Sequence, residues 1–378
     1  MNLFIYPHCH IKSTASESLV YDGKTGQSVY LNSLSLSECE RENLSHGLLE
    51  INNPAKKEFA ELCIQKKMGY YLHDVAHTPF VLGRDINIKQ SLTKERNCLG
   101  YNLASSTNQL LKKITILLNS SIEWLTENEC LQIEYPYNNN CDINIDYIIN
   151  QLRSFEYLEE IVLAGEFNAE ILESVTTYAK EHGLIIIYRM IYTHEHKSIL
   201  PIILEKYKCL QVELITRPTD AYNDIEQIAN ERLIMKGLIK NIEDVESFRY
   251  INFINYIPVL SKENDGLVKH LIVSQSDVLD SRKSTENCNL SSVINTGAYS
   301  RLIINYDGIV MCLGRSIDSL YKRDLSDILN KWISEDHCAW FYTREKKDSC
   351  RNCALQCVCP PISIYEVLEF YKCPCSHY

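Results

Sequence analysis

The cysteines near the C-terminus have the spacing of a metal-binding site. Half of the chain's 16 cysteines lie in this part, and Cys350, Cys353 and Cys359 form a Cys-x2-Cys-x5-Cys run. A run of three thiolates needs a fourth ligand, which Cys373 or Cys375 can provide. Four thiolates that converge from short loops suit an iron–sulfur cluster or a structural zinc ion. The sequence therefore predicts a metal site in the last part of the chain.

Disulfides are the main alternative for such a group of cysteines. The N-terminal residues Met1 to Phe4 show no basic region followed by an apolar stretch, so we expect no secretory signal. Without such a signal we expect a cytoplasmic protein, in a compartment whose reducing conditions keep cysteines as thiols. The other eight cysteines are scattered, and we expect most of them to be small core residues. They are Cys9, Cys39, Cys63, Cys98, Cys130, Cys141, Cys209 and Cys288.

Other polar groups give weaker indications of chemistry. The chain has 13 glycines but neither a G-x-G-x-x-G nor a G-x4-G-K-[ST] sequence, so the usual phosphate-binding loops are missing. His8 and His10 alternate along an expected strand and could bind a metal ion, but a partly exposed strand face is the simpler interpretation. His194 and His196 lie in a polar loop, where we expect solvation rather than metal binding.

Composition limits the classes of partner. The chain has 378 residues, 45% of them hydrophobic, which allows two or three domains with sizeable cores. A net charge of -11 argues against a general nucleic-acid-binding protein, because phosphate binding requires clustered Lys and Arg. No apolar run approaches the roughly 18 residues of a membrane span. We therefore expect neither nucleic acid nor a membrane as a partner.

Residues 1–75 are expected to form a small winged-helix-like module. The segment from Tyr21 to Tyr30 has two glycines between strand-like flanks, which predicts a β-hairpin. A helix is expected to begin at Asn53-Pro54, where Asn can cap and Pro can occupy the first turn. This helix should run to about Lys67, with Lys56 among the lysines that face solvent. Residues 76–111 have no sustained period and are expected to form a linker.

A different pattern covers residues 112–280, where apolar strand-like runs alternate with amphipathic helical ones. This pattern is typical of a parallel sheet covered by helices, and it predicts a partial or complete βα barrel. The expected strands are Ile114–Leu118, Ile161–Leu163, Leu184–Tyr188, Leu210–Ile215, Tyr250–Tyr256 and His270–Val273. The expected helices are Ile145–Phe155, Ala169–His182, Ser198–Tyr207 and Ile225–Lys236.

Residues 281–378 are expected to form a third, small domain. The runs Arg301–Ile304 and Ile309–Cys312 flank Asp307-Gly308, which is a strong signal for a hairpin. A helix with Leu325 and Trp332 on its apolar side precedes the cysteines. A bound metal would help to hold so small a domain in its folded state.

Taken together, these three parts resemble the radical SAM peptide maturases that carry a SPASM domain. The closer resemblance is to the pseudo-radical-SAM proteins of Bacteroidetes systems that mature ribosomally made peptides (RiPPs), and it spans nearly the whole chain. It is carried above all by the block Cys350-x2-Cys353-x5-Cys359-Pro360-Pro361-x3-Tyr365-Glu366. Shorter matching segments are Phe4 to His8, Leu19 to Asp22, His73 to Val75, Ile114 to Asn119, Ile294 to Gly297 and Asn305 to Gly308.

The resemblance implies an α/β fold in three parts. These are an N-terminal winged-helix-like module for peptide recognition, a partial (β/α) barrel of the radical SAM type, and a small cysteine-rich SPASM-like domain. In true radical SAM enzymes, a Cys-x3-Cys-x2-Cys motif after the first barrel strand binds a cluster whose fourth iron site accepts S-adenosylmethionine. This chain has no such motif, and the loop after Asn119 contains only Cys130. We therefore expect a pseudoenzyme that does not cleave S-adenosylmethionine and has no catalytic residues.

A second departure from the family lies after the next expected strand. Ala164-Gly165-Glu166 resembles the family's Gly-Gly-Glu-Pro turn, which meets the methionine amine, but Phe167 replaces the proline.

The resemblance also implies which cysteines bind metal. SPASM domains bind their second auxiliary [4Fe–4S] cluster with such a cysteine run and one later cysteine. The corresponding residues are Cys350, Cys353, Cys359 and Cys375, with Cys373 as the alternative fourth ligand and zinc as the alternative metal. For a first auxiliary cluster, Cys312 matches, but Ser363 stands where a further cysteine is expected. The alternative ligands of such a second site are Cys338, Cys357 and Cys373, together with Cys312.

The resulting hypothesis is a non-catalytic adaptor in RiPP maturation. It would bind the precursor peptide and a catalytic radical SAM maturase, with the leader added as a strand to the hairpin around Leu19 to Tyr30. The alternative for this hairpin is an edge that packs on the barrel. Two other functions are an electron-transfer subunit with an auxiliary [4Fe–4S] cluster, and a zinc-dependent or repurposed enzyme with Glu166 at the barrel mouth.

Overall fold

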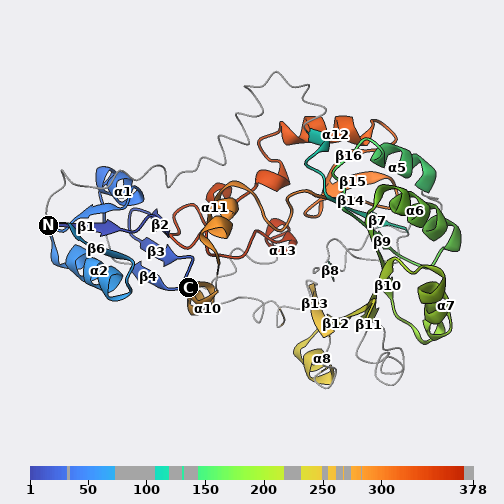
Figure 1. Ribbon diagram of the computed structural model, residues 1–378, viewed down its shortest axis with the longest axis horizontal. Helices are drawn as coiled ribbons and strands as arrows, with labels where there is room; N and C mark the ends of the chain where they lie inside the picture. Colours follow the sequence, from blue (N-terminus) through green and yellow to red (C-terminus); the bar gives the residue numbers. More distant parts are fainter. Residues whose placement is uncertain are drawn as a thin grey trace.

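The structure of the chain is a computed structural model (Figure 1). It describes residues 1–31, 35–72, 107–118, 130–131, 144–216, 231–248, 254–260, 267, 274–281 and 283–369. As predicted, the fold is mixed α/β, with two three-stranded sheets in the N-terminal part and one mostly parallel sheet of ten strands. Within these ranges, none of the helices combines the length and the hydropathy that a membrane crossing requires.

Two small antiparallel sheets and two helices make up the N-terminal part. β1 lies between β5 and β6 in one sheet, and β3 lies between β2 and β4 in the other. The predicted hairpin is confirmed, because β3 and β4 pair antiparallel with Tyr21 opposite Ser28. The elements are β1 (Asn2–Ile5), β2 (Cys9–Ser13), β3 (Ser18–Asp22), β4 (Ser28–Leu31), α1 (Glu38–Ser45), β5 (Leu48–Glu50), α2 (Pro54–Gln65) and β6 (Gly69–Leu72).

Helix α2 begins where the sequence predicts. Asn53 is its N-cap, and the side-chain oxygen of Asn53 accepts a hydrogen bond from the backbone N–H of Lys56 at 2.9 Å. The expectation that Lys56 faces solvent was wrong, because this side chain is buried. Its ammonium group pairs with Glu40 and donates to Asn52 Oδ1 at 2.8 Å. A buried ammonium group needs such partners to offset its loss of hydration.

The ten-stranded sheet has the order β16-β15-β14-β7-β9-β10-β11-β12-β13-β8. Neighbouring strands from β14 to β8 are parallel, whereas the β14–β15 and β15–β16 pairs are antiparallel. The strands are β7 (Lys113–Leu117), β8 (Cys130–Leu131), β9 (Glu160–Ala164), β10 (Ile185–Ile191), β11 (Leu210–Thr216), β12 (Leu233–Ile239), β13 (Ile254–Leu260), β14 (Arg301–Ile304), β15 (Ile309–Cys312) and β16 (Arg315–Ser319).

The helices of this larger part confirm the predicted helices between the first strands. Among those before β14 are α5 (Ile145–Leu152), α6 (Ala169–His182), α7 (Ile199–Lys206), α8 (Ile242–Ser247), α10 (Gln275–Asp280) and α11 (Thr285–Val293). After β16 come α12 (Leu325–Ile333) and α13 (Ile364–Val367), and short 3-10 turns cover His194–Lys197, Ala339–Phe341 and Arg344–Lys346.

Alternate residues of the parallel strands face two different environments. One face carries apolar side chains, such as Ile161 and Tyr188, that form the main core with α5, α6 and α7, which lie along one side of the strands in Figure 1. The other face carries buried charges. Arg189 Nε donates to Glu213 Oε2 at 2.6 Å, and Lys236 Nζ lies 3.0 Å from Glu213 Oε1. The strands are therefore not apolar on both faces.

One predicted element differs from the structure, and two others lie partly or wholly outside the described residues. The sequence predicts a helix at Ile225–Lys236, but residues 233–236 belong to β12, and residues 225–230 lie outside the described residues. β12 obtains its hydrogen bonds from β11 and β13 on both sides, and this pairing outweighs a weak local preference. The strand predicted at Tyr250–Tyr256 overlaps β13 at residues 254–256, and residues 250–253 lie outside the described residues. The strand predicted at His270–Val273 lies outside the described residues.

The C-terminal hairpin joins the large sheet. β14 and β15 have the predicted bounds, and β14 pairs in parallel with β7. One sheet therefore includes strands from both sides of the domain boundary predicted at residue 280. Of the predicted linker, only residues 107–111 are described.

Candidate metal centre

The Cys-x2-Cys-x5-Cys run forms two consecutive backbone turns. The N–H of Cys353 donates to the carbonyl of Cys350 at 3.0 Å, and the N–H of Cys359 donates to the carbonyl of Leu355 at 2.9 Å. Cys350, Cys357 and Cys359 are all buried, and Cys353 is half-buried. Burial and the turn hydrogen bonds together hold these thiols in the interior of the C-terminal region.

None of the eleven cysteines whose side chains the structure describes takes part in a disulfide. Cys373 and Cys375, the two predicted fourth ligands, lie outside the described residues. The described part of the tail therefore contributes three of the four expected ligands.

A buried guanidinium group lies against the first cysteine of the run. Arg344 Nη1 donates to Cys350 Sγ at 3.6 Å, and the same guanidinium makes two hydrogen bonds of 2.9 Å with the carboxylate of Glu366. Arg344 also donates to the carbonyls of Pro360 and Pro361, at 2.6 and 3.2 Å. Burial lowers the pKa of Arg344, but Glu366 and the nearby thiols raise it overall, so this side chain stays a cation.

A second cation, which is half-buried, lies at the other end of the run. Lys283 Nζ donates to the carbonyl of Cys359. Burial lowers the pKa of Lys283, and the neighbouring thiols of Cys288, Cys359 and Cys357 offset part of this shift. Positive charge beside the run favours a bound group that carries negative charge. The surroundings of the run are thus suited to an anionic thiolate–metal group.

Cys288 joins this environment from α11, and the sequence did not single it out. Its thiol is buried and hydrogen-bonded to that of Cys357. This hydrogen bond lowers the pKa of Cys288; burial acts in the opposite direction, and Lys283 lowers the pKa further. Burial and the negative charge on Cys288 raise the pKa of Cys357. No spacing signal connects Cys288 with the run, because α11 lies far from it in the sequence.

The structure therefore places four thiols in one apolar cluster, those of Cys288, Cys353, Cys357 and Cys359. No three of these sulfur atoms lie within 4.8 Å of one another. Among the described residues, only His8, Cys9 and Asp22 have ligand atoms that are all this close together. A tetrahedral zinc ion with Zn–S bonds of about 2.3 Å holds its sulfur atoms about 3.8 Å apart. In an iron–sulfur cluster each thiolate binds a different iron atom, which allows wider spacing.

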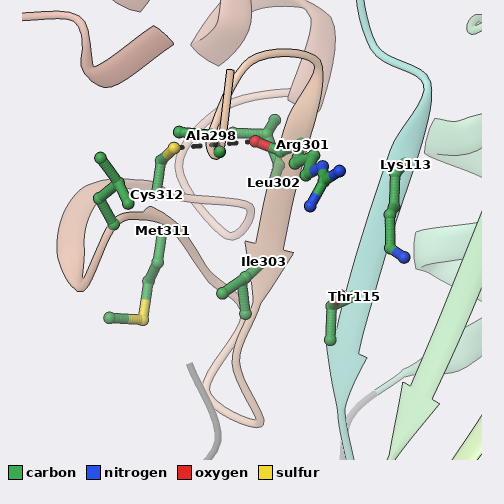
Figure 2. Close-up of a pocket in the computed structure, with 10 residues that line it drawn as sticks. Lys113, Thr115, Ala298, Arg301, Leu302, Ile303, Met311 and Cys312 are labelled. Carbon is green, nitrogen blue, oxygen red and sulfur yellow. Dashed lines mark hydrogen bonds between the residues drawn. The ribbon is translucent and has the colours of Figure 1, made fainter. Parts of the chain in front are cut away.

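The described cysteines of the alternative second site lie in two different clusters. Cys312 and Cys338 belong to the main core, whereas Cys357 belongs to the cluster with Cys288. Cys312 Sγ lies 3.8 Å from the carbonyl oxygen of Arg301, and burial raises the pKa of the Cys312 thiol. Figure 2 shows Cys312 among the residues that line a small pocket of about 40 Å³, and most of these residues come from β7, β14, β15 and the segment before β14.

Ser363 has a clear structural role at the position where the resemblance expects a cysteine. Its hydroxyl accepts a hydrogen bond from the N–H of Glu366 at 3.3 Å, and the Glu366 carboxylate accepts one from the N–H of Ser363 at 3.3 Å. This reciprocal pair is a capping box for α13. The position thus contributes a helix cap in place of a thiolate.

The β3 hairpin contacts the cysteine-rich region. The hydroxyl of Tyr21 accepts a hydrogen bond from the N–H of Lys283 at 2.6 Å and donates to the carbonyl of Ser281 at 2.9 Å. Glu17 Oε2 accepts a hydrogen bond from the N–H of Ala354 at 3.0 Å. Leu19 and Tyr21 lie in the same apolar cluster as the four thiols, and Figure 1 shows β2 and β3 next to α11. The hairpin therefore packs on the cysteine-rich region. The alternative considered from the sequence was an edge that packs on the barrel.

Glu166 lies exposed after the C-terminal end of β9, as the barrel interpretation expects. The preceding Gly165 donates its N–H to the carbonyl of Arg189 at 3.1 Å and accepts a hydrogen bond from the hydroxyl of Tyr188 at 3.0 Å. Phe167 packs edge-on against Tyr188, with ring centroids 6.2 Å apart. The phenylalanine that replaces the family's proline is therefore a packing residue.

Comparisons with known proteins do not assign the chain to a family. No family model matches the sequence, and none of the curated proteins matches it. Among solved structures, Streptococcus suis SuiB bound to its precursor peptide SuiA aligns over 98% of both chains, with 10% identity and a TM-score of 0.41. SuiB bound to S-adenosylmethionine aligns over 98% of this chain and 97% of that one, with 12% identity and a TM-score of 0.38.

A third structure, thiamine phosphate pyrophosphorylase from Pyrococcus furiosus, covers 59% of this chain and 94% of that one, with 8% identity and a TM-score of 0.28. Scores in this range establish neither a common fold nor a common activity.

Proposed function

We propose that the chain is a non-catalytic adaptor in RiPP maturation, with a metal centre in its tail and a peptide-binding edge in its N-terminal part. The observation that carries this proposal is the direct contact between the β3 hairpin and the buried thiols, through Tyr21 and Lys283. The missing Cys-x3-Cys-x2-Cys motif supports a non-catalytic role. The chain would act as a pseudo-radical-SAM protein with a SPASM-like tail.

The metal centre is a [4Fe–4S] cluster bound by Cys350, Cys353 and Cys359, with Cys375 or Cys373 as the fourth ligand. Two features favour iron–sulfur over zinc. The thiols are spaced more widely than in a tetrahedral zinc site, and the cations of Arg344 and Lys283 lie beside the run. A cluster bound by four thiolates carries net negative charge, which Lys283 and Arg344 would offset.

Metal analysis of anaerobically purified protein tests this centre. We expect about four iron and four sulfide ions per chain, and their loss in the double variant Cys350→Ser/Cys353→Ser. Cys209→Ser, at an exposed position elsewhere, is the matched control. One zinc ion per chain without iron would reject the [4Fe–4S] cluster. Protein that contains neither iron nor zinc would reject the metal centre.

The leader peptide binds as an added strand beside β4. Among the described residues, β4 is an edge strand that pairs only with β3. An edge of this kind offers unpaired backbone groups to an extended peptide. Hydrogen exchange of the full-length protein should show protection of residues 28–31 when the cognate leader is added, and no protection with a scrambled leader. A leader that fails to bind the folded protein would reject this part of the proposal.

The catalytic partner is a radical SAM maturase. Co-purification from cells that express both chains should yield a complex, and the peptide should be modified only when both chains are present. If this chain alone modifies the peptide, the adaptor role is wrong.

Electron transfer through the tail cluster is the second candidate function, because cations beside a cluster, such as Arg344 and Lys283, stabilise its reduced, more negative form. A cluster that is reduced and reoxidised reversibly by the maturase would support electron transfer. If the maturase neither reduces nor oxidises the cluster, the cluster has only a structural role in the adaptor.

A further inference from the structure

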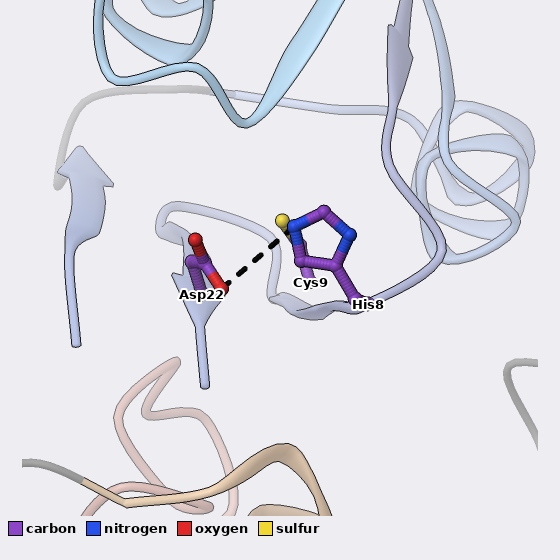
Figure 3. A group of neighbouring side chains, drawn as sticks. All are labelled: His8, Cys9 and Asp22. Atoms are coloured by element: carbon purple, nitrogen blue, oxygen red, sulfur yellow. Dashed lines mark ion pairs between the residues drawn. The ribbon is translucent and has the colours of Figure 1, made fainter. Parts of the chain in front are cut away.

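A second group of metal-binding side chains lies in the N-terminal part, away from the cysteine-rich tail. Figure 3 shows His8, Cys9 and Asp22 around one point. One ligand atom from each residue lies within 4.8 Å of the other two, and His8 Nε2 is 3.8 Å from Asp22 Oδ1. These three residues are the only such group that the described part of the chain contains.

Backbone structure places all three side chains. Cys9 and Asp22 are directly opposite each other in the β2–β3 pair. The N–H of Cys9 donates to the carbonyl of Tyr6 at 3.0 Å, which closes a turn that holds His8 next to the start of β2. The His8 ring also stacks on Tyr6, with centroids 5.6 Å apart and an interplanar angle of 13°. The three ligand atoms are therefore brought together by the sheet and the turn before any ion binds.

The carboxylate of Asp22 is fixed and keeps room for a ligand bond. Oδ1 accepts a hydrogen bond from the N–H of Lys24 at 2.8 Å, and Oδ2 accepts one from the hydroxyl of Thr25 at 2.7 Å. A carboxylate has about four acceptor positions, so two remain.

The donor set is one that zinc accepts. Imidazole nitrogen, thiolate sulfur and carboxylate oxygen all bind Zn²⁺, which is four-coordinate in most protein sites. Cys9 and Asp22 are buried, while the half-exposed His8 leaves a path from solvent. Three protein ligands leave one coordination position for water or a further donor.

We propose that His8, Cys9 and Asp22 bind one zinc ion. This site does not depend on the adaptor function or on the tail centre. Binding displaces the thiol proton of Cys9, and the ion then links the Tyr6–Cys9 turn to the end of β3. The simpler explanation of the same residues is that Asp22 shapes the turn after β3 and Cys9 fills the core. In that explanation His8 only stacks on Tyr6 and lies beside Asp22, and its substitution would leave the metal content unchanged. Substitutions at His8 therefore separate the two explanations.

The test uses the full-length protein, freed of metal by a chelator and then titrated with Zn²⁺ and with Co²⁺. We expect His8→Ala to lower the zinc content by about one ion per chain and to weaken cobalt binding by more than about tenfold. Cys9→Ser should abolish the thiolate-to-cobalt absorption of this site. The controls are His46→Ala and Cys39→Ser, two exposed positions in the same N-terminal part.

The tail cysteines also bind these ions if the tail centre exists, so the titration is repeated in the Cys350→Ser/Cys353→Ser background. An ion that depends on His8 in both backgrounds supports the site, whatever the tail binds. Because Cys9 is buried, its variant is interpreted together with His8→Ala, which changes a half-exposed side chain. Zinc content and cobalt absorption that match the controls in His8→Ala would overturn the proposal.

Discussion

At the scale of single residues, the tail is organised by buried charges as much as by its cysteines. Arg344 bridges Glu366, Cys350 and two proline carbonyls, so one side chain connects α13 with the cysteine run. Lys347 adds a second cation on the same carboxylate, at 2.9 Å. These contacts connect the run to α13 and set the charge around its thiols.

Removing the charge of Glu366 should therefore destabilise the protein strongly. Glu366→Gln leaves the Arg344 and Lys347 cations without their carboxylate, and breaking a buried pair of this kind costs about 3 kcal/mol or more in the free energy of unfolding. Urea unfolding measures the change. The control is Asp348→Asn, which breaks the exposed pair with Arg351 and should cost less than about 1 kcal/mol. Similar losses in the two variants would contradict the role of the buried pair.

The pair between Glu40 and the buried Lys56 makes the stability of the N-terminal part depend on pH. Hydrogen bonds from Lys56 and Ser37 lower the pKa of Glu40 to about 2. In the unfolded chain a glutamate has a pKa of about 4.3. Because the folded value is lower, this stabilisation is fully present above about pH 4.3 and is lost as the pH falls to about 2.

The measurement is the urea midpoint between about pH 4.3 and about pH 2. Glu40→Gln should flatten the decline that the unchanged protein shows, because the amide does not titrate. Glu38→Gln, at an exposed position of the same helix turn, should leave the decline as it is. An equally steep decline in Glu40→Gln would show that another group causes it.

At the scale of elements, the β3 hairpin has two roles on its two sides. Its β4 edge is the proposed binding site for the leader, while Tyr21 and Leu19 of β3 pack on the cysteine-rich cluster. β3 and β4 pair directly in one sheet. A change in the packing of β3 on the cysteine-rich cluster would therefore act on the proposed binding edge through this one strand pair.

The hydroxyl of Tyr21 should contribute measurably to this contact. Tyr21→Phe keeps the ring but leaves the N–H of Lys283 and the carbonyl of Ser281 without their partner, which costs about 2 kcal/mol in the free energy of unfolding. Tyr321→Phe, at a side chain that is 66% exposed, is the control. Faster hydrogen exchange at the Lys283 amide should accompany the loss. An unchanged Lys283 amide would mean that the contact contributes nothing to stability.

At the scale of the whole molecule, the first and last parts of the chain lie against each other while the large sheet lies to one side (Figure 1). Contacts across this boundary include the Tyr21 hydrogen bonds and the pair of Lys12 with Glu345, at 3.8 Å. Metal bound in the tail would therefore stabilise the N-terminal hairpin as well.

Removal of the tail metal should thus loosen β3 and β4 together with the cysteine run. At a ligand concentration about 100-fold above its dissociation constant, binding stabilises the folded state by about 2.7 kcal/mol. Hydrogen exchange before and after chelation measures how far this effect extends. We expect faster exchange in residues 18–31 and no change in β10 and β11. Unchanged exchange in residues 18–31 would mean that the hairpin and the tail are not coupled.

Local signals predicted individual elements well where they agreed with the tertiary environment. Helix α6 has the predicted bounds because Asn168 caps its start, Gly183 ends it at φ 68°, and its apolar residues repeat with the helical period. Residues 233–236 were predicted as helix and form a strand, because pairing with β11 and β13 outweighs a weak local preference. Lys56 is buried by a partner in another helix, which no local pattern reveals.

The sequence by itself determined that the chain is α/β, that cysteines spaced for metal binding lie near its C-terminus, and that the motif for S-adenosylmethionine cleavage is missing. Spacing and periodicity are local properties, so they can be read from the order of residues. Only the tertiary structure decided that Cys288 joins the buried thiols, that Arg344 and Lys283 supply the charge around them, and that His8, Cys9 and Asp22 meet in one place. Each of these depends on contacts between segments far apart in the chain, which form only when strands and helices pack.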